Sequence, residues 1–242
     1  MSAAARRVLI LQHLTHDGPA GLAQWLQAQG VAFDVFNTEA GDAFPASMAG
    51  YDALAVLGGE MGANDPLPSL RRAEALILEA MAHDLPVLGL CLGGQLMARA
   101  LGARVAASPA PEVGWHRVDI AASPVAREWF GDLSSATVFQ WHYDAFDLPP
   151  QAELLASSAA CPHQAFAIGR HLGLQFHVEV DAGKVATWAA AIDSRYDTAQ
   201  ASSTVHGPTR LVEDTRRHLE AQQVLAARLY ARWLSHQEMT IS

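Results

Sequence analysis

The sequence contains few cysteines, few charges and no long hydrophobic run, and each of these shortages excludes a class of protein. Two cysteines in 242 residues are too few for a disulfide-stabilised extracellular domain, and they predict a cytoplasmic location. A charged fraction of 17% beside a hydrophobic fraction of 50% excludes a disordered chain. No apolar stretch is long enough to span a bilayer, and the residues before Val8 lack the cleavage region of a signal peptide.

The sequence also lacks the marks of several binding functions. A net charge of -9 and the lack of a basic stripe exclude nucleic acid and anionic membranes as expected partners. We find no internal repeat, no zinc-type spacing of Cys and His, and no glycine-rich phosphate loop of an ATP-binding domain. We therefore expect a small-molecule substrate, no metal and no cofactor. The length suits one α/β domain with extensions.

Strands and helices alternate along the first hundred residues. The expected strands are apolar runs at 8–11, 31–36, 53–57 and 86–90, and the expected helices cover about 22–30, 67–83 and 92–102. Continuous apolar strands that alternate with helices predict an α/β fold, with a mostly parallel, doubly wound sheet covered by helices on both faces. From Val105 to Phe176, shorter strands of alternating polarity predict a smaller antiparallel extension.

The residues from 181 onward predict C-terminal helices in two pieces. The first is expected to end near Tyr196, and the second covers about 209–236. An apolar stripe along the second piece predicts that it docks on the parent domain, with a homodimer contact as the alternative. We therefore divide the chain into a main domain, 1–196, and a linker with a docked C-terminal helix, 197–242.

A cysteine with glycines on both sides follows the strand expected at 86–90. The letters G-L-C-L-G surround Cys91 with the spacing of a nucleophile elbow. Such a turn strains the backbone of the nucleophile and crowds it between strand and helix, so residues without a Cβ are needed on both sides. A helix N-terminus at the turn also favours thiolate over thiol. The alternative is a buried core cysteine at an ordinary strand-to-helix turn.

A second pattern brings an imidazole and a carboxylate together. The run from Gly173 to Glu179 predicts a strand, in which His177 and Glu179 lie two residues apart and point to the same side. A carboxylate beside an imidazole fixes its tautomer and stabilises the imidazolium. Alone, this pattern is typical of a surface pair. Together with the elbow upstream, it predicts a Cys-His-Glu triad.

Three motifs resemble those of the class I, triad-type glutamine amidotransferases. G-L-C-L-G-G-Q around Cys91 is similar to the family's G-[IVL]-C-x-G-x-Q, and G-L-Q-F-H-V-E, which ends at Glu179, is similar to its G-x-Q-F-H-P-E. V-L-G-G-E-M at 56–61 stands where the family has a glycine-rich oxyanion loop. The resemblance covers about residues 8–180 and implies a flavodoxin-like fold. Within the family, the chain is similar to the glutaminase domain of GMP synthase.

The resemblance implies a role for each matching residue. Cys91 resembles the nucleophile that attacks the γ-carboxamide carbon of glutamine, His177 the base, and Glu179 the residue that orients His177. The backbone N–H groups of Gly59 and Leu92 resemble the two donors of the oxyanion hole. The reaction that this implies passes through a γ-glutamyl thioester, which water hydrolyses to glutamate. The positions that match substrate-binding residues are Gly58, Gln95, Trp141 and His142.

The chain departs from the family pattern at three positions. Val178 replaces the proline usual between the His and the Glu, and Glu60 replaces the proline that often follows the oxyanion glycine. Trp141 stands where many members have the serine of a Ser-His-x-Asp run, although His142 and Asp144 match it. In those members this run docks the amino-acid head group of glutamine largely through backbone. The amide chemistry is therefore better supported than the group that carries the amide.

Three functions remain open at this point. The first is a glutamine amidotransferase-like enzyme that hydrolyses glutamine and passes ammonia to an unidentified acceptor or synthetase partner. The second is a hydrolase of γ-glutamyl amides or peptides that uses the same triad and needs no partner. The third, from a different class, is a binding or regulatory module without turnover. The presence of Cys91, His177 and Glu179 argues against the third. We prefer the first and keep the second as the alternative.

Overall fold

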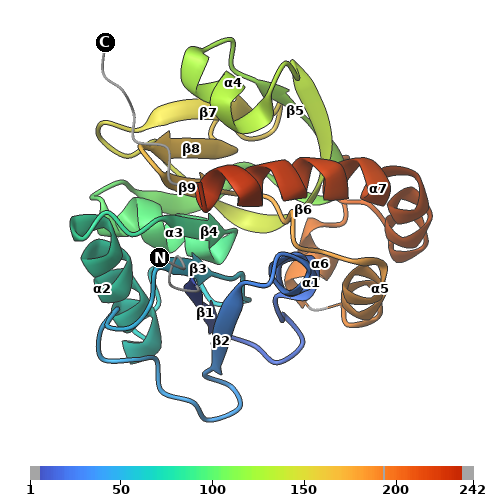
Figure 1. Ribbon diagram of the computed structural model, residues 1–242. Helices are drawn as coiled ribbons and strands as arrows, with labels where there is room; N and C mark the ends of the chain where they lie inside the picture. Colours follow the sequence, from blue (N-terminus) through green and yellow to red (C-terminus); the bar gives the residue numbers. More distant parts are fainter. Residues whose placement is uncertain (1–5, 193, 236–242) are drawn as a thin grey trace.

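A single mixed sheet organises the computed structural model, which describes residues 6–192 and 194–235 (Figure 1). The described strands follow the order β2-β1-β3-β4-β9-β8-β7-β5-β6. The parallel part consists of β2 (Ala32–Asn37), β1 (Arg7–Gln12), β3 (Ala53–Val56), β4 (Val87–Leu90) and β9 (His171–Leu174). The antiparallel part consists of β8 (Ala165–Ile168), β7 (Glu153–Ser157), β5 (Val105–Ile120) and β6 (Ser135–Phe146). The expected α/β architecture is confirmed.

Helices cover both faces of the mixed sheet. The described helices are α1 (Ala20–Ala28), α2 (Pro68–Ala82), α3 (Leu92–Ala100), α4 (Pro124–Phe130), α5 (Ala182–Ala190), α6 (Ser194–Ala199) and α7 (Pro208–Trp233). Neighbouring side chains of a strand point to opposite faces. In β1, Val8 and Ile10 therefore join the core beneath α1, α4 and α7, whereas Leu9 and Leu11 join the core beneath α2 and α3. This division explains why the central strands are apolar throughout.

The antiparallel extension differs from the sequence expectation. Instead of short strands, β5 and β6 are 16 and 12 residues long, and a bulge between Ala107 and Glu112 interrupts their pairing. A bulge bends a long hairpin, so one hairpin can serve both the sheet edge and the region near residue 177. The backbone amide of His177 donates to the carbonyl of Phe139 in β6 at 2.9 Å. The hairpin therefore meets the chain just beyond β9.

The strand expected from Gly173 to Glu179 is also shorter than predicted. β9 ends at Leu174, and residues 175–179 form bends outside the sheet. The amide of His177 bonds to β6 rather than to a ladder partner of β9, which explains why the strand stops. His177 and Glu179 therefore lie on an irregular segment, and their spacing of two no longer reflects strand geometry.

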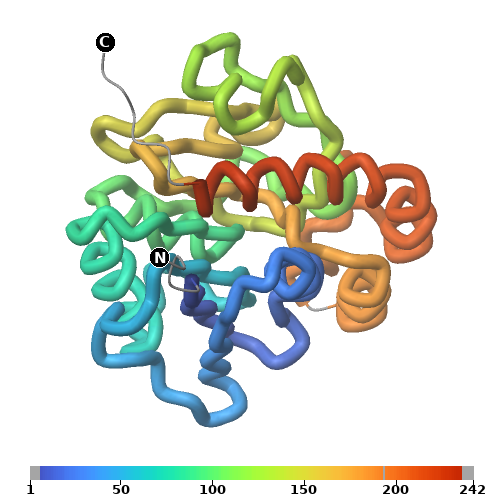
Figure 2. The backbone as a smooth tube through the Cα atoms, in the orientation of Figure 1, coloured from blue at the N-terminus to red at the C-terminus, as the bar shows by residue number. Residues whose placement is uncertain are grey.

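The C-terminal helices follow the strands in the chain, and α7 crosses the molecule beside α1, as the trace in Figure 2 shows. The first expected piece is interrupted, because α5 ends at Ala190 and α6 is a separate short helix. α7 covers most of the second piece, and His236 lies outside the described residues. Leu229 and Trp233 of α7 are fully buried in the core shared with α1 and β1. The proposed division after residue 196 falls within α6 and stays a prediction.

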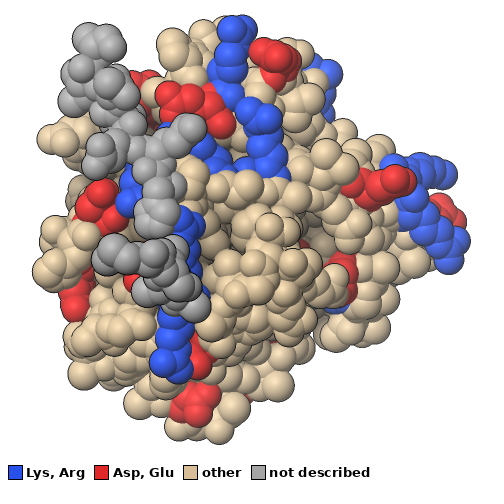
Figure 3. Space-filling view, in the orientation of Figure 1, with Lys and Arg blue, Asp and Glu red and all other residues tan. Residues whose placement is uncertain are grey.

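Basic and acidic side chains are interspersed on the face that α7 crosses (Figure 3). Several of the arginines have acidic partners, among them Arg232, whose guanidinium lies 2.6 Å from the carboxylate of Glu128. Within the described residues, no helix combines the length and apolarity needed to cross a membrane.

Candidate active site

β4 leads into a tight turn at the carboxyl end of the parallel sheet. Cys91 follows the last residue of β4 and precedes Leu92, the first residue of α3. Its φ of 48° and ψ of -106° lie in a region that residues with a Cβ rarely adopt. The amide of Cys91 donates to the carbonyl of Leu174 at 2.9 Å, which ties the turn to the end of β9. The turn therefore has the strained geometry expected of an elbow, with its thiol beside a helix N-terminus.

Gly93 allows α3 to pack closely against β3. A Cβ on Gly93 would overlap the carbonyl oxygen of Val56. We expect Gly93→Ala to lower the free energy of unfolding by at least about 3 kcal/mol, because backbone rather than a movable side chain blocks the new methyl group. The matched control is Gly183→Ala in α5, where the nearest atom is 3.4 Å away. Urea denaturation should show a gain of up to about 1 kcal/mol there; equal losses in both variants would contradict this account.

His177 and Glu179 form a buried pair beside Cys91. Nδ1 of His177 lies 2.8 Å from Oε1 of Glu179, and both side chains are at most 3% exposed. A Cβ on Gly58 would lie 2.9 Å from Cε1 of His177 and 3.7 Å from Cβ of Cys91. Gly58 therefore leaves the space in which the thiol and the imidazole meet. On its other side, the His177 ring packs edge-on against Trp188, with ring centroids 4.9 Å apart.

Lys184, the only lysine of the sequence, lies behind this pair. Its Nζ is 3.0 Å from Oε1 of Glu179 and 2.5 Å from Oδ1 of Asp17, and it donates to the carbonyl of Gly18 at 2.9 Å. The Lys184 side chain is only 4% exposed. The sequence analysis missed Lys184 and Asp17. The sequence did contain a signal for Lys184, because all other strongly basic residues of the chain are arginines.

Gln175 is a further neighbour of the thiol to which the sequence analysis gave no role. Its Nε2 donates to Sγ of Cys91 at 3.7 Å, and its Oε1 accepts from Nε2 of Gln95 at 3.4 Å. The Gln175 side chain is fully buried. Its place in the G-L-Q-F-H-V-E motif was the signal, and a buried donor at the sulfur stabilises negative charge there.

Opposite charges keep the groups of this site ionised. Burial alone would lower the pKa of His177, but its interactions with the Glu179 carboxylate and with the sulfur of Cys91 raise it to about 10. Burial alone would raise the pKa of Glu179, but Lys184 and His177 lower it to about 2. Burial likewise opposes the charge of Lys184, yet Glu179 and Asp17 raise its pKa. At neutral pH the site therefore holds an imidazolium, a carboxylate and an ammonium.

These shifts predict how stability depends on pH. A raised His177 pKa stabilises the fold below pH 6.5, and this contribution is lost as the pH rises from 6.5 to about 10. A lowered Glu179 pKa stabilises the fold above pH 4.5, and this contribution is lost as the pH falls from 4.5 to about 2. We expect Glu179→Gln to flatten both slopes, each worth roughly a few kcal/mol. Urea denaturation across this range tests it; parallel curves for the variant and the parent would contradict it.

One pocket joins most of the residues that the sequence singles out. Its walls include Gly59, Cys91, Gln95, Trp141, His142 and His177. Gly58 and Leu92 are not part of the wall, but each adjoins a wall residue, and the amide of Leu92 is the first of α3. Glu179 lies behind His177 and does not reach the pocket. Parallel α/β sheets commonly bind ligands at the carboxyl ends of their strands, and the end of β4 forms part of this pocket.

Hydrogen bonds to backbone carbonyls fix the β6 segment of the pocket wall. Nε2 of Gln95 donates to the carbonyl of Asp144 at 3.0 Å, and Nδ1 of His142 lies 3.1 Å from the same oxygen. The thiol of Cys91 donates to the carbonyl of Trp141 at 3.6 Å. The backbone from Trp141 to Asp144 is therefore fixed relative to the elbow.

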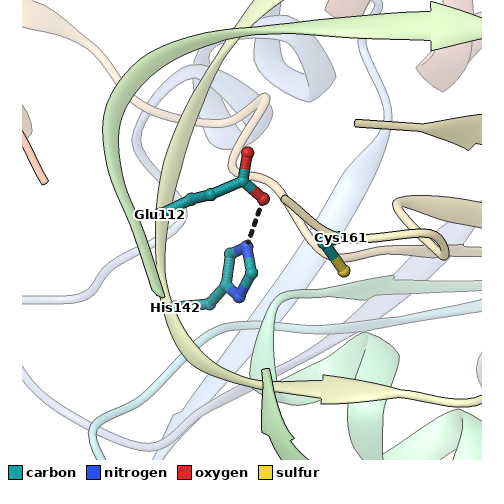
Figure 4. A group of neighbouring side chains, drawn as sticks. All are labelled: Glu112, His142 and Cys161. Atoms are coloured by element: carbon teal, nitrogen blue, oxygen red, sulfur yellow. Dashed lines mark hydrogen bonds and ion pairs between the residues drawn. The ribbon is translucent and has the colours of Figure 1, made fainter. Parts of the chain in front are cut away.

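The side chain of His142 belongs to a buried cluster with Glu112 and Cys161 (Figure 4). The ligating atoms of these three residues lie within 4.8 Å of one another. Nevertheless, the Glu112 carboxylate already accepts from Ser158 at 3.0 Å and from Gln164 at 2.6 Å, and it lies 3.1 Å from Nε2 of His142. Burial raises the pKa of the Cys161 thiol to about 11, so this thiol stays protonated. Hydrogen bonds therefore account for the cluster.

The same contacts determine how His142 can meet a ligand. A carbonyl oxygen only accepts, so Nδ1 of His142 carries a hydrogen toward Asp144. Nε2 then faces the Glu112 carboxylate, 3.1 Å away. Both ring nitrogens are used and the His142 side chain is fully buried. A ligand can therefore meet only the backbone of His142.

Comparisons with known proteins agree with this geometry. The family model for class-I glutamine amidotransferases matches residues 20–187. The glutamine amidotransferase-like protein YfeJ of Salmonella typhimurium is 31% identical over 180 residues, which cover 72% of this chain and 75% of YfeJ. A glutamine-hydrolysing GMP synthase subunit from Thermoplasma acidophilum is 35% identical over 136 residues, which cover 54% and 65% of the two chains. The match to the GMP synthase of Thermomicrobium roseum spans only 21% of that protein.

Solved structures share the fold over nearly the whole chain. A glutamine amidotransferase from Methylobacillus flagellatus is 32% identical, with a TM-score of 0.90. The match covers 97% of this chain and 99% of the Methylobacillus chain. A glutamine amidotransferase from Thermotoga maritima is 29% identical, with a TM-score of 0.84, and covers 96% and 99%. The family model matches more than half of the chain, and the match to YfeJ covers most of both proteins. The protein therefore belongs to the class-I glutamine amidotransferase family.

Proposed function

We propose that this protein hydrolyses the γ-carboxamide of L-glutamine through a γ-glutamyl thioester on Cys91. The observation that carries the proposal is the convergence of a strained cysteine turn and a buried His177–Glu179 pair on one pocket. Membership of the class-I amidotransferase family supports glutamine-amide hydrolysis in general. The individual roles that follow are our assignment.

In the first half of the reaction, Cys91 acts as the nucleophile. In the reactive pair the thiol proton resides on His177, and the thiolate attacks the carboxamide carbon to form a tetrahedral oxyanion. The amides of Gly59 and Leu92 donate to this oxygen, and the second of these stands at the N-terminus of α3, where the helix dipole favours negative charge. The imidazolium then protonates the departing nitrogen. The C–N bond breaks, ammonia leaves, and the thioester remains.

In the second half, water replaces sulfur. His177 takes a proton from the water as its oxygen attacks the thioester carbon, and the C–S bond breaks to give glutamate and free Cys91. Glu179 supports the imidazolium at each stage, and Lys184 keeps Glu179 ionised. Neither Glu179 nor Lys184 reaches the pocket, so we assign both as positioning residues.

The proposed reaction releases ammonia, which calls for an acceptor. The relative from Thermoplasma acidophilum is named as one subunit of a GMP synthase. We therefore propose that ammonia from this site serves a synthetase carried by another protein. Addition of such a partner should raise the glutaminase rate.

A second candidate is the hydrolysis of γ-glutamyl amides or peptides by the same residues. The observation that favours it is Trp141, a bulky pocket residue in place of the small residue expected at that position. The two candidates differ only in the leaving group. A binding or regulatory module is the least supported, because the Cys91 turn stores backbone strain that pure binding does not need.

An assay of purified protein decides between the two enzymatic candidates. Ammonia and glutamate release are measured with L-glutamine, a γ-glutamyl anilide and a γ-glutamyl dipeptide, with Cys91→Ala as the blank. Preference for glutamine supports the first proposal, even at a slow rate. Rapid cleavage of the bulkier amides with little action on glutamine would replace it by the second.

A further inference from the structure

A strong cation lines the pocket. Among the described residues that line the pocket, Arg195 is the only lysine or arginine. Lys184 is 4% exposed and bound by Asp17 and Glu179, so it cannot meet a ligand. His177 is paired with Glu179 and faces the scissile group. An anionic group of a bound substrate would therefore find its counter-charge at Arg195.

The polar contacts of Arg195 with its neighbours are loose. Its guanidinium carbon lies 4.5 Å from the ring centre of Tyr143, which places the group against the end of β6. One nitrogen donates to the carbonyl of Glu60 at 3.3 Å, and another lies 3.5 Å from the carboxylate of Asp144. Both polar distances are at the long limit for hydrogen bonds, and the Arg195 side chain is 43% exposed. A carboxylate that enters the pocket can therefore form shorter, two-pronged bonds to the same group.

The backbone of Asp144, beside Arg195, is fixed by hydrogen bonds. The carbonyl of Asp144 is held by Gln95 and faces Nδ1 of His142, so the Asp144 side chain starts from a rigid backbone. Its carboxylate is 30% exposed beside the guanidinium. The pocket wall thus presents a positive and a negative group next to each other. An amino-acid head group carries the complementary pair of charges.

We propose that Arg195 is a specificity residue that binds the α-carboxylate of the substrate, while Asp144 accepts a hydrogen bond from its α-ammonium group. The inference rests on the proposed function and restricts its substrate class. L-Glutamine and γ-glutamyl compounds with a free amino-acid head group are substrates, and simple carboxamides are not. Trp141 takes the position where many family members have a serine, and the head group is here bound by side chains from β6 and α6.

Binding measurements test this assignment without the need for turnover. Calorimetry with Cys91→Ser protein compares L-glutamine with γ-aminobutyramide, which lacks the α-carboxylate. Adding Arg195→Gln should weaken glutamine binding about tenfold, at the low end for a charged hydrogen bond because the site is partly exposed. The same change should leave the binding of γ-aminobutyramide within about twofold. Arg195→Lys should fall between, since it keeps the charge but loses the planar fork.

The matched control is Arg117→Gln. Arg117 lies on β5, is 67% exposed, pairs with Asp119 and does not line the pocket. It should leave the binding of both ligands unchanged. Equal weakening of both ligands by Arg195→Gln, no weakening of either, or failure of Cys91→Ser protein to bind glutamine would each overturn the proposal.

Kinetics of the parent protein separate this inference from the proposed function. Arg195→Gln should raise the KM for glutamine about tenfold and change kcat less than threefold, because the head group is bound equally in the ground and transition states. If glutamine binds through Arg195 but is not hydrolysed, the specificity assignment stands and the proposed reaction fails. If glutamine is hydrolysed and Arg195→Gln changes kcat alone, the reaction stands and the assignment fails.

Discussion

Replacement of Cys91 by alanine should lower the rate of glutamine hydrolysis at least about a thousandfold. No other described nucleophile stands at the end of β4, and residues that act as a catalytic unit lose nearly all their effect when the nucleophile is removed. Cys91→Ser should be almost as severe, because a hydroxyl gives up its proton far less readily than a thiol. Ammonia release from L-glutamine measures both variants.

The other members of the site should rank below the nucleophile. His177→Ala should approach the loss of Cys91→Ala, since the thiol then has no base. Glu179→Gln should cost less, because Glu179 orients and charges His177 without touching the substrate. The matched control is Cys161→Ala, which removes the second thiol from a buried position outside the pocket. Retention of most turnover by Cys91→Ala, or equal losses in Cys91→Ala and Cys161→Ala, would refute the assignment.

Replacement of Lys184 by methionine should lower the free energy of unfolding by about 3–5 kcal/mol at neutral pH. Methionine keeps the length of the side chain but removes the charge. The carboxylates of Glu179 and Asp17 then remain buried without their shared ammonium, and burial of an unpaired charge is costly. Loss of the ammonium also raises the pKa of Glu179, so the His177 imidazolium is less well supported. Urea denaturation and the rate of glutamine hydrolysis measure the two effects.

The double variant Lys184→Met/Asp17→Asn isolates the charge from the packing. It removes one of the two stranded carboxylates, so it should recover part of the stability that Lys184→Met loses. It should not recover the rate, since Glu179 still lacks its cation. A loss below about 1 kcal/mol in the single variant would mean that this ion pair contributes no more than a surface pair. Equal stability of the single and double variants would mean that packing, and not charge, explains the loss.

The parts of the site that local sequence determines could be predicted. The apolar runs that form β1 to β4 and the glycines around Cys91 predicted the sheet and the turn, because strand burial and backbone crowding depend on residues close in the chain. The proximity of His177 and Glu179 was also predicted, but from an extended strand that the structure does not have at these residues. The structure brings them together on bends beyond β9, where contacts with β6 determine the path.

The parts that depend on distant contacts could not be predicted. Asp17 and Lys184 meet across most of the chain, and no local pattern links an acidic loop residue to a helix that follows β9. Arg195 lines the pocket from α6, a short helix that the expected single helix up to Tyr196 did not include as a separate element. The length of β5 was missed for a similar reason, since a bulge allows a strand to continue where its polarity pattern breaks.

Covalent labelling tests the central claim most directly, and it needs no partner protein. The reagent is an L-glutamine analogue whose carboxamide is replaced by a chloromethyl ketone, so that attack by a thiolate forms a stable S–C bond and releases chloride. Cys91 lines the pocket, whereas Cys161 is fully buried and its pKa is raised by that burial. We predict one label per chain, located on Cys91 by peptide mass spectrometry, slowed by excess L-glutamine and absent from Cys91→Ala. Labelling of Cys161, no labelling, or labelling that excess glutamine does not slow would contradict the account.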